Sequence, residues 1–273
     1  MTLFTVMSYN LVFGRGKILH FGQLAFSLMG AYAFFVPLVR YDWPIWASLI
    51  IGIFGVILVS LLFAWLSLRL ETDGLGVMSI AVHLMFLSVV LNWQGMTRGA
   101  LGIPGIPRLP FMESLEGFTV TVVILCGLWM TVLWYVGKGH FGRMLSALSE
   151  GQWPAASLGI SRRSVHMIAF CISGLGAFLS NLTWHSYLRL LSPVDFGFPV
   201  MIFFVMVVVA GGAGSFRGCF LSTVILVSLK EGLRFLNLAP SVIGPLQLLL
   251  FGVILFTAVW VRRETVFPKQ RVV

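Results

Sequence analysis

Nine apolar stretches, separated by short polar segments, divide the chain from one end to the other. Most have the roughly 20 residues that an α-helix needs to cross the hydrocarbon core of a bilayer. The first is shorter, and at about 1.5 Å per residue it covers only about 20 Å of a core about 30 Å thick. It is either a short first span or a truncated one. The stretches are 1–14, 20–38, 44–68, 74–93, 118–136, 165–188, 196–210, 219–236 and 243–261.

This pattern predicts an all-α polytopic membrane protein with about nine transmembrane helices, in a range of eight to ten, folded as a single domain over 1–273. Composition agrees, because 59% of the residues are hydrophobic and 10% are charged, against about 25% charged in soluble proteins.

The net charge of +9 does not indicate nucleic-acid binding, because the basic residues lie at the ends of apolar stretches. Cys126, Cys171 and Cys219 lie inside apolar stretches and are interpreted as core residues. The sequence predicts no metal and no cofactor in this chain.

The longest polar interruption of the second half, 138–163, orients the chain. Four cations, Lys138, Arg143, Arg162 and Arg163, accompany a single acid, Glu150. The positive-inside rule therefore places this loop in the cytoplasm. Within the loop, Pro154 suits the first position of a helix and Gly159 suits the residue just past its end, so we expect a short helix over 155–158.

The distribution of basic residues supports this orientation. If nine spans alternate, twelve cations fall on the cytoplasmic side and six on the other, with the C-terminal tail 262–273 in the cytoplasm. The cytoplasmic set is Arg15, Lys17, Arg69, Lys138, Arg143, Arg162, Arg163, Arg217, Arg262, Arg263, Lys269 and Arg271. The opposite set is Arg40, Arg98, Arg108, Arg189, Lys230 and Arg234.

Glycine and proline mark the remaining irregular segments. Three prolines within 104–110 forbid a continuous helix, so 94–117 is an extramembrane loop or a re-entrant segment packed against protein. Ser192, Pro193 and Asp195 form a helix-capping pattern, which favours a structural role for Asp195 over contact with a solute. Four glycines within 211–218 predict a sharp turn.

Four segments, taken in order, resemble the permease subunits of branched-chain amino acid ATP-binding cassette (ABC) importers of the LivM type. They are HFGQLAFSLMGAY (20–32), LNWQGMTRGALGIPGIP (91–107), the 142–160 loop with its paired alanines, and SP…F…GGAGS…G (192–218). The resemblance covers nearly the whole chain.

The resemblance implies a bacterial inner-membrane, multi-pass subunit. Its expected partners are a second homologous permease, two cytoplasmic ATP-binding subunits, a periplasmic solute-binding protein and membrane lipid. It also implies that the cytoplasmic loop carries a coupling helix, which contacts the ATPase. The residues expected there are Glu150, Pro154, Ala155, Ala156, Ser157, Leu158 and Gly159.

The chain also departs from the family pattern. Ala-Leu-Ser-Glu-Gly-Gln at 147–152 stands where relatives commonly read Ala-Ile-Arg-Glu-Asn-Glu, so contacts with the ATPase are expected to be weaker or altered. Leu84 and Leu87 stand where relatives often carry polar or charged residues, and Arg98 and Leu101 replace the usual Gly and Asn. Branched-chain amino acids are therefore not assured as the solute.

Polar residues inside apolar stretches are candidates for the translocation path, because such groups usually face the bundle or a wet cavity. They recur four residues apart, on one face of a helix. The alternative for each is hydrogen bonding between helices. The candidates are Gln23, Ser27, Ser79, His83, Asn181 and His185, with Thr183 between the last two.

The function predicted from these features is that of a permease subunit for hydrophobic amino acids or a related small solute such as urea, an amide or a small carboxylate. An ion-coupled secondary transporter is the alternative, although Asp195 and Glu231 are the acids near apolar spans in the second half and both lie close to helix ends. A membrane enzyme is a more distant alternative, because no nucleophile–base pair or carboxylate dyad is recognisable.

Overall fold

Helices dominate the protein, whose computed structural model describes residues 1–108, 112–235 and 240–261. The first half contains α1 (Thr2–Tyr9), the π-helical turn η1 (Asn10–Arg15), α2 (Gln23–Arg40), α3 (Ile45–Arg69), α4 (Thr72–Asn92), α5 (Gln94–Thr97), η2 (Gly99–Leu101) and β1 (Ile103–Pro104). The second half contains α6 (Leu115–Lys138), α7 (His140–Glu150), α8 (Gln152–Ser157), α9 (Arg162–Leu188), β2 (Leu190–Leu191), η4 (Pro193–Phe196), α10 (Phe198–Gly211), α11 (Phe216–Gly232), η5 (Leu233–Phe235) and α12 (Pro240–Val261).

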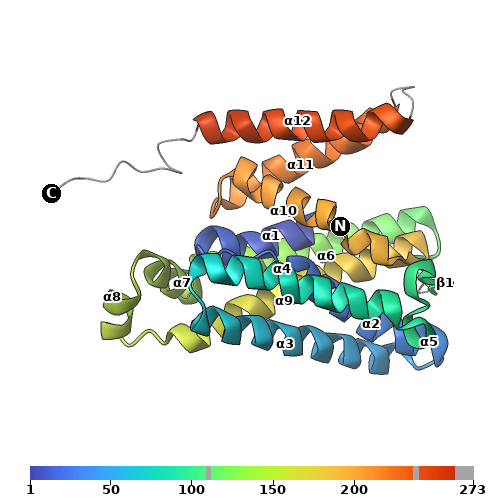
Figure 1. Ribbon diagram of the computed structural model, residues 1–273, viewed down its shortest axis with the longest axis horizontal. Coiled ribbons are helices and arrows are strands. Elements are labelled where there is room, and N and C mark those ends of the chain that lie inside the picture. The colour runs from blue at the N-terminus through green and yellow to red at the C-terminus, as the bar shows by residue number, and fades with distance from the viewer. Residues whose placement is uncertain (109–111, 236–239, 262–273) are drawn as a thin grey trace.

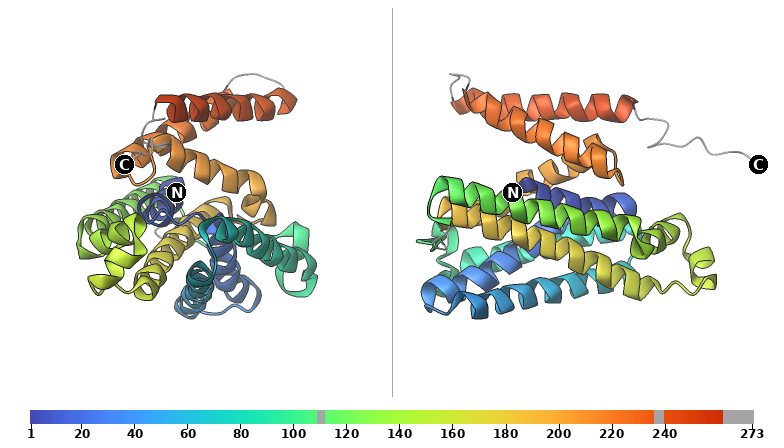
Figure 2. Two further views of the ribbon diagram at one scale, coloured as in Figure 1. Left: turned by 60° about the vertical axis from the view of Figure 1, so that its left-hand side comes forward. Right: turned by 180° about the vertical axis from the view of Figure 1, so that it is seen from behind.

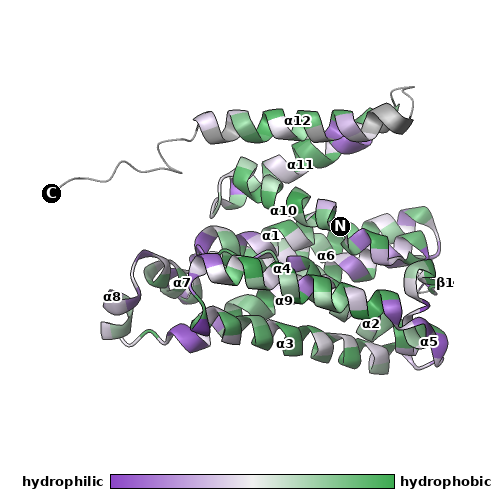
Figure 3. Cartoon of the chain, in the orientation of Figure 1, coloured by the Kyte–Doolittle hydropathy of each residue, from purple (hydrophilic) through white to green (hydrophobic). Residues whose placement is uncertain are grey.

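Five helices are long and apolar enough to cross a membrane, judged over the described residues by length and composition. These are α2, α3, α4, α6 and α9, and they confirm a polytopic helical membrane protein. The other four predicted stretches are also helical, as α1 with η1, α10, α11 and α12, so the total of about nine spans stays a prediction. The helices carry mostly apolar side chains, whereas polar residues gather around α7, α8 and α5 (Figure 3).

The core lies where α2, α3 and α9 pack against one another and α1 covers α9 (Figure 1). Small residues allow this close packing. A Cβ on Gly30 of α2 would lie 2.5 Å from Val56 Cγ2 of α3, and one on Gly174 of α9 would lie 2.5 Å from Ser60 Oγ. Phe178 fills the space beside Gly30, and it is 2% exposed. The absence of a side chain at Gly30 and Gly174 therefore permits the close approach of α2, α3 and α9.

The helices α11 and α12 form a separate layer at one side of this core, joined to it through α10 and through contacts between α11 and α1 (Figures 1 and 2). The helix α6 packs mainly beside α1, α7 and α9, and most of its surface is exposed. Long apolar side chains on its outer face, such as Val120, Val123 and Leu128, are suited to lipid or to another membrane subunit.

The two ends of the bundle differ in structure. At one end, α7 and α8 project beyond the spans; at the other, β1 and β2 form a two-residue antiparallel ribbon in which Ile103 pairs with Leu191 (Figure 1). The ribbon shows that the proline-rich segment is irregular and packed against protein. Arg108 supports it by donating to the carbonyl oxygens of Ser186 and Tyr187.

Basic residues of the predicted cytoplasmic set lie at the α7–α8 end, and residues of the opposite set lie at the β1–β2 end. Seven cations of the predicted cytoplasmic set line three cavities at the α7–α8 end: Arg15, Lys17, Arg69, Lys138, Arg143, Arg162 and Arg217. From the opposite set, Arg40 bonds the Gly95 and Met96 carbonyls beside α5, and Arg108 lies at the β1–β2 ribbon. The predicted tail 262–273 lies outside the described residues.

Candidate coupling and translocation sites

Two consecutive helices, α7 and α8, make up the polar loop. Only one short helix was predicted there from the sequence, so α7 is an additional helix. A periodic signal for α7 was present, because Phe141, Leu145 and Leu148 recur at helical spacing and the last two are buried. These side chains hold α7 against the core and so fix where α8 begins. The short predicted helix exists as α8, but it starts earlier than expected.

The position predicted for Pro154 within the short helix is wrong by two residues. Gly151 is the extended residue before α8, so Gln152 is the first helical residue and Pro154 is the third. Proline is still compatible with this position, because the amides of the first turn have no partner within the helix. Leu158, predicted as the last helical residue, is the cap that follows Ser157.

Gly159 does stand just past the end of α8, as predicted. Its φ of 77° is left-handed, a conformation that glycine adopts without steric penalty. The amide of Gly159 donates to Ala156 O at 2.9 Å, and that of Ile160 donates to Ala155 O at 3.1 Å. This pair of bonds is a Schellman motif, which satisfies the last carbonyls of the helix and turns the chain toward α9.

The surface of α8 is unusually apolar for an exposed helix. Trp153 is 89% exposed and Leu158 is 77% exposed, whereas Ala155 is buried and holds the helix to the core. Glu150, Pro154, Ala156 and Ser157 are also exposed. A large aromatic and a large aliphatic side chain presented together on a projecting helix are typical of a surface that contacts another protein.

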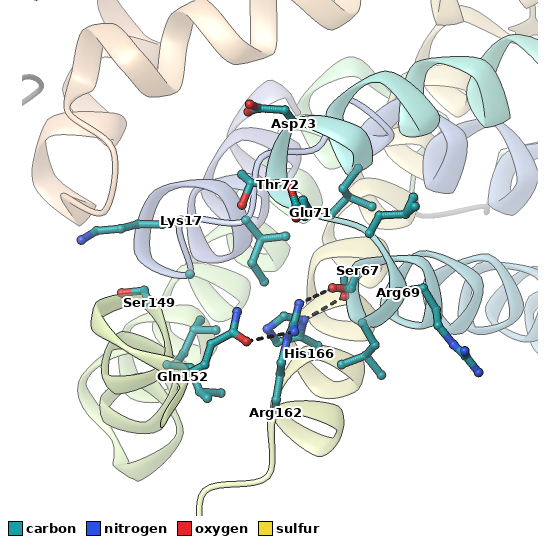
Figure 4. Close-up of a pocket in the computed structure, with 17 residues that line it drawn as sticks. Lys17, Ser67, Arg69, Glu71, Thr72, Asp73, Ser149, Gln152, Arg162 and His166 are labelled. Atoms are coloured by element: carbon teal, nitrogen blue, oxygen red, sulfur yellow. Dashed lines mark hydrogen bonds between the residues drawn. The ribbon is translucent and has the colours of Figure 1, made fainter. Parts of the chain in front are cut away.

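A cavity of about 650 Å³ lies beneath α8 (Figure 4). It is bounded by the turn after η1, the connection from α3 to α4, the end of α7 and the start of α9. Arg162, Gln152, Ser67 and His166 point toward one another inside it, whereas Lys17, Arg69 and Asp73 point outward (Figure 4). In the sequence, Arg162 is recognisable only as one of the charges that indicate topology, and no pattern identifies the other three residues as members of a site.

Gln23 and Ser27, the first pair of path candidates, lie in the packed interface of α2. Gln23 Nε2 donates to Ser173 O of α9 at 3.2 Å, and Gln23 Oε1 accepts from Ser173 Oγ at 2.8 Å. The amide is thus used in bonding between helices, which is the structural alternative weighed for it. Ser27 is fully buried, and its hydroxyl bonds no other described residue.

Ser79 and His83 lie on the buried face of α4 and hold neighbouring segments. Ser79 Oγ accepts from Phe21 N at 2.8 Å and donates to Gly76 O at 2.6 Å. His83 Nε2 bonds Phe196 O at 2.8 Å, so α4 is linked to the short helix η4. Both side chains are 0% exposed.

Asn181 and His185 lie on one face of α9 and bond each other. Asn181 Oδ1 lies 3.1 Å from His185 Nε2, and His185 Nδ1 lies 3.0 Å from Leu190 O. Asp195 Oδ2 is 3.8 Å from the same Nδ1. Thr183 bonds carbonyls of its own helix. Thus α9, β2 and η4 are held together around His185, and the Ser192 hydroxyl accepts from Val194 N, as its predicted capping role requires.

The candidate path residues therefore occupy separate places in the bundle. Asn181 lines a cavity of about 600 Å³ between α1, α6, α9, α10 and α11, near the β1–β2 end. Apolar side chains such as Phe203 and Phe204 line most of it, and Asp195, Lys230 and Glu231 also line it. The other five candidates do not line this cavity. The described residues include no group of acids, histidines and cysteines that could hold a metal ion.

A bundle of apolar helices with an exposed apolar helix projecting at one end is typical of a membrane protein that assembles with other subunits. The chain belongs to the family of branched-chain amino acid transport system permease components, whose family model matches residues 1–259. The resemblance seen in the sequence is thereby confirmed. No solved structure is significantly similar to the chain.

Named relatives agree with this assignment. The chain is 26% identical over 294 residues to the high-affinity branched-chain amino acid transport system permease protein LivM of Escherichia coli K12, covering 97% of this chain and 67% of the relative. It is 25% identical to LivM of Salmonella typhimurium, with the same coverage. The autoinducer 2 import system permease protein LsrC of Escherichia coli K12 is 24% identical over 146 residues, covering 51% of this chain and 39% of LsrC.

The family assignment makes the chain a transmembrane permease subunit of an ABC importer and not an enzyme, with ATP hydrolysis on partner subunits. It is an integral membrane protein that works with other transporter subunits. The secondary-transporter alternative is not favoured.

Proposed function

We propose that this chain and a second homologous permease form the path by which an ABC importer moves branched-chain or other small apolar amino acids, or a related small solute, across the bacterial inner membrane. The relatives supply the solute class, since two are named for branched-chain amino acids and one for autoinducer 2. The remaining partners are two cytoplasmic ATP-binding subunits and a periplasmic solute-binding protein. The chain itself uses no cofactor.

The coupling helix of this importer is α8. The observation that carries the proposal is the exposure of Trp153 and Leu158 on a helix that projects beyond the spans, ended by Gly159 in a left-handed conformation. Burial of such side chains against an ATPase would contribute about 25 cal/mol for each Å² of apolar area removed from water, opposed by the entropic cost of association. The α7–α8 end is then cytoplasmic, which agrees with its cluster of cations.

Co-expression with the ATP-binding subunits, the second permease and the binding protein encoded beside it tests this function. Purified complex in liposomes should take up labelled leucine, isoleucine or valine when ATP and binding protein are supplied, and the chain alone should not. Uptake by the single chain, driven by an ion gradient, would contradict the proposal. Competition by unlabelled solutes would identify the preferred one.

A pair of variants isolates α8 within this assay. Ala156→Arg places a long cation on the exposed face of α8 and should abolish stimulation of ATP hydrolysis by loaded binding protein. His140→Arg changes an exposed residue of α7 at the same end and should leave stimulation near the wild-type level. Normal uptake by the Ala156→Arg complex at normal expression would show that α8 is not the coupling helix.

A further inference from the structure

Arg162 occupies a position that the α9 helix by itself does not favour. It is the first residue of α9, and no acidic residue lies in the first turn. A helix N-terminus carries a partial positive charge, so a cation there is unfavourable. The Arg162 guanidinium instead reaches away from its own helix to acceptors on two other helices (Figure 4).

The first acceptor belongs to α8 and the second to α3. Arg162 Nη1 donates to Gln152 Oε1 at 3.0 Å, and Gln152 is the first residue of α8. Arg162 Nη2 donates to the backbone oxygen of Ser67. Ser67 lies in the last turn of α3, where carbonyls lack helical partners and the partial charge is negative, so the cation is favourable there.

The same end of α3 has a second bond to α9. Ser67 Oγ lies 2.8 Å from His166 Nδ1, and His166 is one turn along α9 from Arg162. Ser67 and His166 are both buried. Deeper in the bundle, Gly174 of α9 packs against Ser60 and Val56 of α3. The α3 and α9 helices are therefore joined at their ends and along their length, whereas α8 is joined to this pair through Arg162.

Few other polar bonds fix α8. Ser157 Oγ donates to Pro154 O inside the helix. Among the described residues, the bond from Arg162 to Gln152 is the one side-chain hydrogen bond that connects α8 to another part of the chain. Apolar contact through Ala155 resists separation of α8 from the bundle, but it is non-directional.

We infer that Arg162 is a positioning residue that transmits displacement of α8 to the ends of α3 and α9. The inference rests on the proposed coupling role of α8. The planar guanidinium can bind two acceptors at once with a fixed angle between them, which a lysine ammonium on a flexible stem does not reproduce. Movement imposed on α8 by a partner is then carried to a pair of spans instead of being absorbed by the loop.

The experiment uses the complete transporter and measures basal ATP hydrolysis, its stimulation by loaded binding protein, and uptake. Arg162→Lys keeps the charge but loses the two-acceptor geometry, and Arg162→Gln loses both. Each should assemble with the ATPase and retain basal hydrolysis, while uptake per ATP hydrolysed falls by about tenfold or more, as expected for loss of a charge-assisted hydrogen bond. The matched control is Arg163→Gln, which removes the exposed neighbouring cation. It should leave the ratio of uptake to ATP hydrolysed unchanged.

Substitutions at Gln152 test whether the loss of transport comes from the missing Arg162–Gln152 bond or from a destabilised fold. Gln152→Ala should lower the uptake per ATP hydrolysed, and the double variant should be no worse than Arg162→Gln alone, because Arg162→Gln already removes the bond to Gln152. Gln152→Glu retains an acceptor for the guanidinium and should keep the wild-type ratio. Additive losses, or equal loss in Gln152→Glu, would overturn the inference.

Failure of this inference is distinguishable from failure of the proposed coupling role. If Ala156→Arg abolishes stimulation while Arg162→Lys and Arg162→Gln keep the wild-type ratio, α8 couples and Arg162 does not transmit. If Ala156→Arg also has no effect, α8 is not the coupling element and the role of Arg162 is lost with it.

Discussion

Asn10 Oδ1 accepts the amide hydrogen of Gly214 at 2.8 Å, although 204 residues separate the two in the chain. Asn10 begins the π-helical turn η1, and Gly214 lies in the glycine-rich turn between α10 and α11. Asn10 Nδ2 also donates to Ser215 O at 3.4 Å. The Asn10 side chain, which is 5% exposed, therefore fixes the turn between α10 and α11 against the start of η1.

Asn10→Ala should destabilise the protein by about 1–3 kcal/mol, because it leaves the partly buried Gly214 amide without its side-chain acceptor. The comparison is Asn92→Ala, since Asn92 is exposed and bonds only Ser88 of its own helix. Thermal unfolding in detergent measures both. Equal stability of the two variants would show that the Asn10 bonds contribute nothing beyond a surface amide.

Gln23→Leu should destabilise the protein by about 1–3 kcal/mol without changing which solutes compete for uptake, because Gln23 bonds α9 rather than solute. Adding Ser173→Ala removes the orphaned hydroxyl and should restore part of the stability. The measurements are thermal unfolding and competition in the uptake assay. If the order in which solutes compete for uptake changes in Gln23→Leu, this residue contacts the solute and lines the translocation path.

Gly159→Val should uncouple transport while the spans still insert. Its left-handed conformation costs a β-branched residue about 1–2 kcal/mol, so the turn after α8 would shift. Expression should stay near normal, and stimulation of ATP hydrolysis by loaded binding protein should fall. Gly159→Asn is the control, because asparagine tolerates this conformation better, and it should retain most stimulation. Loss in both variants would indicate a requirement other than backbone conformation.

Asp195→Asn should change how stability depends on pH. Burial raises the pKa of the Asp195 carboxyl, and the hydrogen bond from Trp184 and the charge of Lys230 offset part of this rise. The folded protein therefore holds this proton to a higher pH than the unfolded chain, whose aspartates have a pKa of about 3.9. Stability of the wild type should fall as pH rises from about 3.9 through the raised folded value.

The variant lacks this contribution, so its stability relative to wild type should increase over that interval and then become constant. Unfolding curves of wild type, Asp195→Asn and Asp42→Asn between about pH 4 and 8 measure it, Asp42 being an exposed acid. Parallel curves for wild type and Asp195→Asn would contradict the assignment.

Single cysteines should place the two ends of the bundle on opposite sides of the membrane. After replacement of Cys126, Cys171 and Cys219, Ser157→Cys on α8 should be labelled from the cytoplasm and Glu113→Cys before α6 from the periplasm. Both positions are exposed. Labelling of the two sites from the same side would exclude the proposed topology.

Local signals explain what could be predicted from the sequence. Apolar stretches gave the positions of the main helices, because a bilayer requires about 20 apolar residues in a row. Gly159 identified the end of α8, since few residues adopt its backbone conformation. The family also followed from ordered short motifs, and the comparison with known proteins confirmed it.

Tertiary contacts explain what could not be predicted. His83 bonds a backbone oxygen 113 residues away, and Gln23 bonds Ser173 across 150 residues, so no nearby residue distinguishes these side chains from groups that line a path. Arg162 appeared only as one of a cluster of charges, because its acceptors belong to two other helices. The start of α8 was misplaced because Pro154 was taken as the first helical residue, whereas Gly151 is the extended residue that precedes the helix and Gln152 begins it.

The pairing of Gln23 with Ser173 sets an order for biogenesis. When α2 leaves the ribosome, the partner of its amide has not yet been synthesised, because it lies 150 residues further along. An amide without a partner is unfavourable in hydrocarbon. The early helices therefore lack this link in the bilayer until α9 has been synthesised, and their packing is completed only when the second half of the chain inserts.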